Sequence, residues 1–119
     1  MSEPETEAFL GSDERTLLLL LAYIHVQHGA AEKAEPLYAA LLALAPDDAE
    51  AAKGLAWARL EMDGAHAALT VLDTIAAPGE PGAVLHLLRA RALARLGHID
   101  DACVAMRSFR KLAGTAISA

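Results

Sequence analysis

Two alanine series that repeat every 34 residues constrain the fold of this chain more than any other feature of its sequence. The first series is Ala22, Ala56 and Ala90, and the second is Ala34, Ala68 and Ala102. The stretches that lead into the second series also look alike: GAAEKA at 29–34, DGAHAA at 63–68 and GHIDDA at 97–102. A fixed period of this length is the signature of a stacked array of supersecondary units. We therefore expect three copies of one unit.

The composition indicates that the units are helical. The chain has 119 residues, enough for one domain with one core. Hydrophobic residues make up 55% of the chain but aromatic residues only 4%, so the apolar content is mostly Ala and Leu. These residues favour helices, whereas sheets are enriched in β-branched and aromatic residues. The predicted fold class is all-α.

Glycine, proline and acidic residues mark the ends of six expected helices. Their approximate ranges are 13–28, 31–44, 48–62, 64–76, 83–96 and 100–112. Gly29 suits a left-handed helix cap, Pro46 closes the second helix, and Asp47 with Glu50 predicts a capping box for the third. Residues 1–12 are expected to form an acidic mobile tail, APGEPG at 77–82 a loop, and GTAISA a short C-terminal tail.

The six helices form three helix–turn–helix pairs in one domain, residues 13–114, with repeats at about 15–48, 49–82 and 83–114. The first alanine series lies in the first helix of each pair, and the second series lies early in the second helix. Small side chains at these places let two antiparallel helices approach closely. The alanines are therefore predicted to be buried where the paired helices meet.

These features resemble the tetratricopeptide repeat (TPR) family over residues 15–114. The resemblance rests on the two alanine series, on Gly29 and Gly97 at the turns, and on Tyr38 and Pro46 in the first repeat. The later repeats depart from the pattern, because Asp63 replaces a turn glycine and Met106 stands where Tyr38 stands. The resemblance implies three repeats stacked into a short right-handed superhelix.

One segment, AYIHVQHGAAEKAEPLYAALLALAPDDAEA, is similar to the YscY (SctY) class of small acidic chaperones from bacterial type III secretion systems. This resemblance implies a cytosolic protein that holds a small hydrophobic export substrate, YscX (SctX), in a heterodimer and keeps it competent for the export gate. Needle-subunit chaperones of the YscG class and translocator chaperones are alternatives, although the latter usually carry an extra N-terminal helix. A self-associating TPR scaffold is a further alternative.

Charge and hydropathy argue against other classes of partner. The net charge is −6 and the Lys and Arg residues are scattered, whereas nucleic-acid binding needs a basic surface. The opening MSEPETEAF is acidic where a secretory signal would be basic, which favours the cytoplasm. The run LLLLLAYI at 17–24 is too short to span a bilayer. We expect neither nucleic-acid binding nor membrane insertion.

The residues that carry chemistry in enzymes do not combine into a site. His25 and His28 are three residues apart, a spacing that can offer two metal ligands, but no nearby carboxylate or cysteine completes a set. The other histidines are isolated, and no nucleophile motif or phosphate loop accompanies them. Cys103 lies among Ala102, Val104 and Met106, which predicts a buried thiol. We expect no catalytic residues, no metal and no cofactor.

The first helices of such arrays line a concave face. Helical spacing predicts nine residues there: Leu19, Tyr23 and Val26 from the first repeat, Lys53, Trp57 and Leu60 from the second, and Val84, Leu87 and Arg91 from the third. This set is mostly apolar and suits an amphipathic helix or an extended hydrophobic segment. The alternative for Trp57 is that it packs between repeats.

Both ends of the array are predicted to be incomplete. The first helix is apolar on every side, although a terminal helix normally keeps a polar outer face. No additional polar helix is expected after the last repeat. A partner protein, or a second copy of the chain in a homodimer, would complete these ends.

Overall fold

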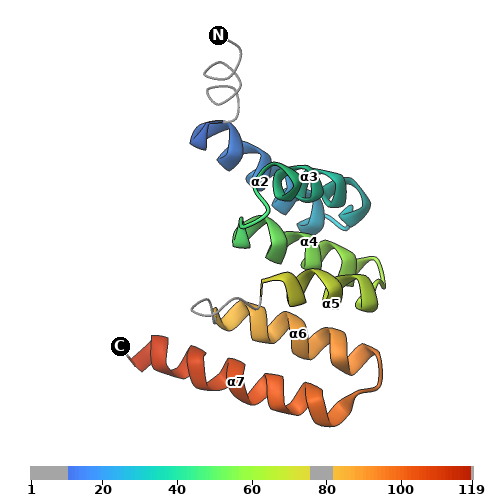
Figure 1. Cartoon of the computed structure of the whole chain (residues 1–119), viewed down its shortest axis with the longest axis vertical. Coiled ribbons are helices and arrows are strands. Elements are labelled where there is room, and N and C mark those ends of the chain that lie inside the picture. The colour runs from blue at the N-terminus through green and yellow to red at the C-terminus, as the bar shows by residue number, and fades with distance from the viewer. Residues whose placement is uncertain (1–10, 76–81, 119) are drawn as a thin grey trace.

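The computed structural model describes residues 11–75 and 82–118, and these residues form helices and turns without a strand. The helices are α2 (Ser12–Gln27), α3 (Ala31–Leu44), α4 (Ala49–Glu61), α5 (Ala65–Thr74), α6 (Ala83–Arg95) and α7 (Ile99–Ser118). They pair into three hairpins that follow one another from α2 at one end to α7 at the other (Figure 1). The predicted all-α, TPR-like stack is confirmed.

The helices pack in sequence order and also across the repeats. Each helix contacts the next one along the chain, and the first helices of successive hairpins touch as well, α2 with α4 and α4 with α6. The first helices therefore form one continuous layer of the stack. Among the described residues, no helix combines the length and the hydropathy that a membrane span requires.

Both alanine series are buried, as the 34-residue period predicts. Ala22, Ala34, Ala56 and Ala68 are completely inaccessible, and Ala90 and Ala102 nearly so. A methyl side chain at each of these places leaves room for the neighbouring helix to approach, and a larger one would push the helices apart.

The turns inside the hairpins repeat with the same period. Gly29, Asp63 and Gly97 follow α2, α4 and α6, and their φ angles are 77°, 63° and 84°. The left-handed cap predicted at Gly29 is confirmed. Asp63 adopts the same conformation with a Cβ atom, which costs an L-residue roughly 1 kcal/mol. A 34-residue spacing thus extends to the backbone conformation.

Two predicted helix ends are wrong. The third helix is capped by Asp48, whose Oδ1 accepts a hydrogen bond from the Ala51 amide at 3.2 Å, so the box of Asp47 and Glu50 does not form. Helix α7 continues through Ser118 rather than ending near Leu112. Gly114 weakens a helix by only about 1 kcal/mol, and no proline follows it to stop the helix.

Cys103 is exposed, which contradicts the predicted burial. On α7 the buried side chains are Ala102 and Ala105, while Cys103 and its neighbour Val104 face outward. Apolar neighbours in sequence do not share a helix face, because successive residues are turned by about 100°. The predicted tail and loop lie mostly outside the described residues, and Gly11 and Ser12 belong to the start of α2.

Candidate functional site

Three equivalent residue pairs lie on the layer of first helices. Each pair is separated by four residues, hence one helical turn, and successive pairs are 34 residues apart: Leu19 and Tyr23 on α2, Lys53 and Trp57 on α4, and Leu87 and Arg91 on α6. Because α4 contacts both α2 and α6, the pairs are neighbours. We call these six residues, together with Val84, the aromatic face.

An aromatic contact joins the first two repeats on this face. The ring centroids of Tyr23 and Trp57 are 5.5 Å apart with the planes tilted by 45°, which is a favourable arrangement for two π systems. Gln27 Nε2 donates a hydrogen bond to the Tyr23 hydroxyl at 2.7 Å and fixes its position. Tyr23 remains 47% exposed. Trp57 packs against the core and is partly exposed, so both interpretations of it hold in part.

A buried tyrosine lies beneath this contact. Tyr38 on α3 packs against α4 at Gly54, where any Cβ atom would overlap its ring. Burial is the main cause that raises the pKa of Tyr38, and the nearby Tyr23 and Glu50 raise it further. The helices that carry Tyr23 and Trp57 are thus positioned by a close approach that only glycine allows.

Two cations border the aromatic rings. Arg91 Nη2 lies 3.1 Å from Glu61 Oε2, so α6 is tied to α4 one turn beyond Trp57 and the arginine charge is balanced. Lys53 lies one turn before Trp57, and within the described parts of the chain it forms no ion pair. The face therefore combines apolar and aromatic side chains with one unbalanced ammonium group.

Two of the nine predicted residues are not on this surface. Leu60 is completely buried and Val26 nearly so, both within the core cluster, which contradicts their predicted exposure. They follow Tyr23 and Trp57 by three residues, and that rotation turns their side chains from the surface toward the neighbouring helices. The other seven keep exposed area: Val84 is exposed, Tyr23 is exposed, and the remainder are partly exposed.

A second apolar surface, which the sequence did not single out, covers the outer side of α2. Leu17, Leu20, Leu21 and Ile24 are 41–64% exposed, and we call them the outer stripe. Their spacing of i, i+3, i+4 and i+7 is that of one helix face. The spacing is visible in the sequence, but it is obscured because every side of α2 is apolar. The prediction that this end of the array is incomplete agrees with the exposure.

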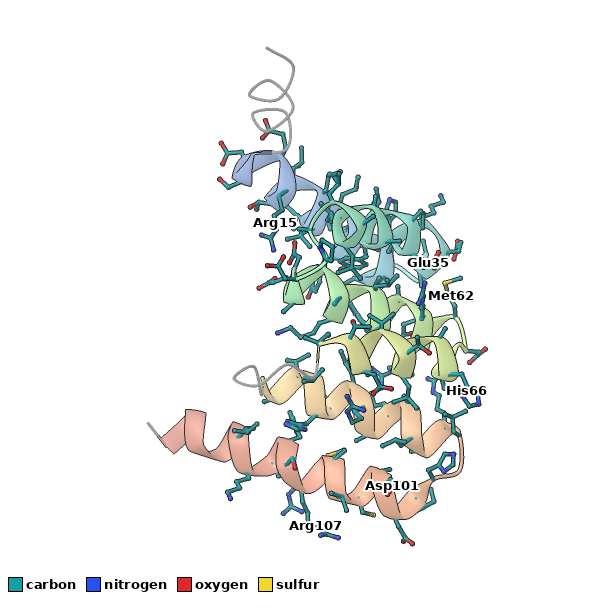
Figure 2. The ribbon with its side chains drawn as sticks, viewed as in Figure 1. Arg15, Glu35, Met62, His66, Asp101 and Arg107 are labelled. Carbon is teal, nitrogen blue, oxygen red and sulfur yellow. The ribbon has the colours of Figure 1, made fainter. Side chains whose placement is uncertain are left out.

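The opposite end does not share this property, so the prediction of an incomplete C-terminal end is wrong. The outer side of α7 carries the exposed charged residues Asp100, Asp101, Arg107 and Arg110 beside Val104. Figure 2 shows Arg107 directed away from the rest of the stack. Helix α7 has the polar outer face that a terminal helix in water requires.

The surface depressions that the described residues line lie elsewhere. The first, about 320 Å³, is bordered by Pro46, Asp48, Thr74 and Ile75, and two others lie around Arg59 and Gly64 and around Asp63 and Arg95. None of them includes a residue of the aromatic face. Over residues 11–75 and 82–118, no three His, Cys, Asp or Glu side chains are grouped to hold a metal ion, and this includes His25 and His28.

Comparison of the chain with models of protein families and with curated proteins finds no match. Its function is therefore inferred from the packing, exposure and charge of its own residues.

Proposed function

We propose that the chain is a non-enzymatic protein-binding module that holds an apolar segment of another protein against the aromatic face. The observation that supports this most is the contact between Tyr23 and Trp57, two large aromatic side chains that remain accessible at the centre of the layer of first helices. Aromatic residues at the centre of an interface often provide a large share of the binding free energy.

The chemistry of the face restricts the partner. Leu19, Val84 and Leu87 extend the apolar area on either side of the two rings, which fits the apolar side of an amphipathic helix. Lys53 provides a positive charge that no described acidic residue balances. A carboxylate on the partner beside its apolar residues would pair with this ammonium group. The proposed partner is thus an amphipathic segment with a predominantly apolar face and an acidic flank.

Within this class we favour a bacterial type III secretion chaperone that acts in the cytoplasm. The resemblance of residues 22–51 to the YscY class supports this assignment, as do the small size and the net charge of −6. Such a chaperone would form a heterodimer with its export substrate, cover the substrate's apolar segment, prevent premature assembly and present it to the export gate. The needle-subunit and translocator chaperones bind apolar segments as well, so they are the alternatives within the same system.

The test is copurification from the native host, identification of the partner by mass, and calorimetric titration of the purified pair. We expect Trp57→Ala to weaken binding about 30-fold, which corresponds to about 2 kcal/mol. Lys53→Glu should also weaken binding, and a partner variant with the matching charge reversal should restore it. Glu32→Ala on α3 is the control, because Glu32 is exposed and outside the face.

Folding must be separated from binding, because Trp57 also packs against the core. Trp57→Phe keeps an aromatic ring and should lose less affinity than Trp57→Ala, while Tyr23→Ala removes a side chain that is already half exposed. Unchanged affinity in folded Trp57→Ala and Tyr23→Ala proteins would exclude the aromatic face as the binding surface.

A further inference from the structure

The outer stripe of α2 is self-complementary, which points to a second copy of this chain as its occupant. The stripe is bordered by Asp13 at its N-terminal end and by His28 at its C-terminal end, and both are exposed. Its four apolar residues lie between these polar ends, and α2 contacts α3 and α4 through a different side.

One antiparallel register matches the whole pattern. When two α2 helices run in opposite directions with paired residue numbers that add up to 41, Leu17 meets Ile24 of the second copy and Leu20 meets Leu21. In the same register Asp13 meets His28 of the second copy, so that a carboxylate faces an imidazole. We propose that two copies of the chain dimerise through this α2–α2 contact, with a two-fold axis between Leu20 and Leu21.

The charges on α2 favour the antiparallel arrangement over the parallel one. A parallel pair would place Asp13 and Glu14 of both copies side by side, which adds like-charge repulsion and aligns the two helix dipoles. The antiparallel pair separates these acidic ends by about 20 Å, given a rise of 1.5 Å per residue. It also gives a closed two-fold contact in which the same patch serves both copies, the commonest form of oligomer.

The size of the stripe predicts a weak dimer. Four residues that are 41–64% exposed form an apolar patch of roughly 300–400 Å² per copy, within the range of the largest patches on monomeric proteins. Two such patches bury about half of the 1,200–2,000 Å² typical of stable interfaces. We therefore expect reversible association with a Kd on the order of 10 µM.

The dimer is independent of the proposed function, because the two surfaces lie on different sides of α2. Leu19 and Tyr23 belong to the aromatic face, and Leu17, Leu20, Leu21 and Ile24 belong to the outer stripe. In a helix, Tyr23 is turned by about 100° from both Ile24 and the middle of the stripe. Dimerisation through the stripe therefore leaves the aromatic face accessible to a partner.

Sedimentation equilibrium of the full chain tests the proposal. We expect the wild-type mass to rise from that of a monomer toward that of a dimer between about 1 and 200 µM, as a Kd near 10 µM requires. Leu20→Glu should remain monomeric throughout this range. Val104→Glu is the matched control, because Val104 on α7 is 54% exposed against 51% for Leu20, and it should dimerise as the wild type does. A monomeric wild type, or a dimeric Leu20→Glu protein, would overturn the proposal.

Cross-linking tests the register independently of any folding defect. In a Cys103→Ser background, Leu17→Cys and Ile24→Cys proteins are mixed and treated with a short bifunctional maleimide. The mixture should form a heterodimeric product, whereas each protein alone should form little, since its two cysteines lie about 10 Å apart along the helix axis. Efficient cross-linking of Leu17→Cys with itself would indicate a parallel pair and contradict the register. Loss of dimers in Trp57→Ala would assign association to the aromatic face instead.

Discussion

The guanidinium group of Arg15 on α2 holds the carboxylate of Asp48 with two hydrogen bonds, from Nη2 to Oδ1 at 2.7 Å and from Nε to Oδ2 at 2.8 Å. Asp48 is also the N-cap of α4, and its side chain is 93% buried in effect, with an exposed fraction of 7%. Figure 2 shows Arg15 beside the acidic side chains at the start of α4. One carboxylate therefore caps the second repeat and ties it to the first.

Substitutions at Asp48 should separate these two roles. Asp48→Ala removes the cap and the ion pair, and we expect a loss of about 2 kcal/mol of unfolding free energy. Asp48→Asn keeps a capping oxygen and loses only the ionic part, which is the smaller share because Arg15 is 39% exposed to solvent. Urea denaturation of both variants measures the difference. Equal losses would mean that the cap contributes nothing.

The same contact should make stability depend on acid. The hydrogen bonds from Arg15 are the main cause that lowers the pKa of Asp48 below its ordinary value. The folded state therefore binds this proton more weakly than the unfolded state, and the contribution is complete above a pH of about 4 and is lost as the pH falls through the folded pKa. The difference in melting temperature between wild type and Asp48→Asn should shrink from pH 7 toward pH 2.5. A constant difference would contradict this linkage.

The parts of the fold that the sequence predicts are those set by steric limits. Ala34 and Ala68 must be small because a second helix lies against them, and Gly29 adopts a φ that favours glycine. Such limits act on single positions and recur with the repeat, so a period of 34 residues reveals them without knowledge of the packing. The hairpins and their turns follow from it.

The errors arise where the outcome depends on rotation about a helix axis. Val26 and Cys103 are each apolar residues among apolar neighbours, and composition does not distinguish the side of the helix that faces a neighbour. Asp48 replaces Asp47 as the cap because Arg15, 33 residues away, adds two hydrogen bonds to it. A contact over that distance in sequence has no local pattern from which it can be predicted.

Gly54→Ala should destabilise the protein although it lies within a helix. Alanine normally stabilises a helix by about 0.5–1 kcal/mol relative to glycine. At Gly54, however, the added methyl group would overlap the buried ring of Tyr38, and overpacking of this kind costs roughly 1–3 kcal/mol. Gly114→Ala on α7 is the control, because nothing lies near its Cβ position, and it should be stabilising. Thermal melts that rank the two variants the other way would contradict the close packing at Tyr38.

Ala68→Leu tests the contact that closes the second hairpin. Ala68 is completely buried, so a leucine there should reduce the unfolding free energy by roughly 1–3 kcal/mol. The neighbouring Ala67 is exposed, and Ala67→Leu makes the same chemical change with an expected effect within about 0.5 kcal/mol. Chemical denaturation of both proteins measures the difference. Similar stabilities would mean that the alanine series is not a packing constraint.

Asp63→Gly should stabilise the chain by restoring the residue that its two equivalent turns carry. Asp63 has a φ of 63°, and its carboxylate is almost fully exposed, so its 3.2 Å ion pair with Arg95 adds little. Glycine removes the conformational cost of roughly 1 kcal/mol, part of which is offset by the greater freedom of glycine in the unfolded chain. Arg95 keeps its 2.7 Å hydrogen bond to the Leu60 carbonyl in either case. We expect a rise in melting temperature of a few degrees for Asp63→Gly and none for Asp63→Ala, which retains the Cβ atom. A lower melting temperature for Asp63→Gly would show that the carboxylate, rather than the backbone conformation, determines the stability of this turn.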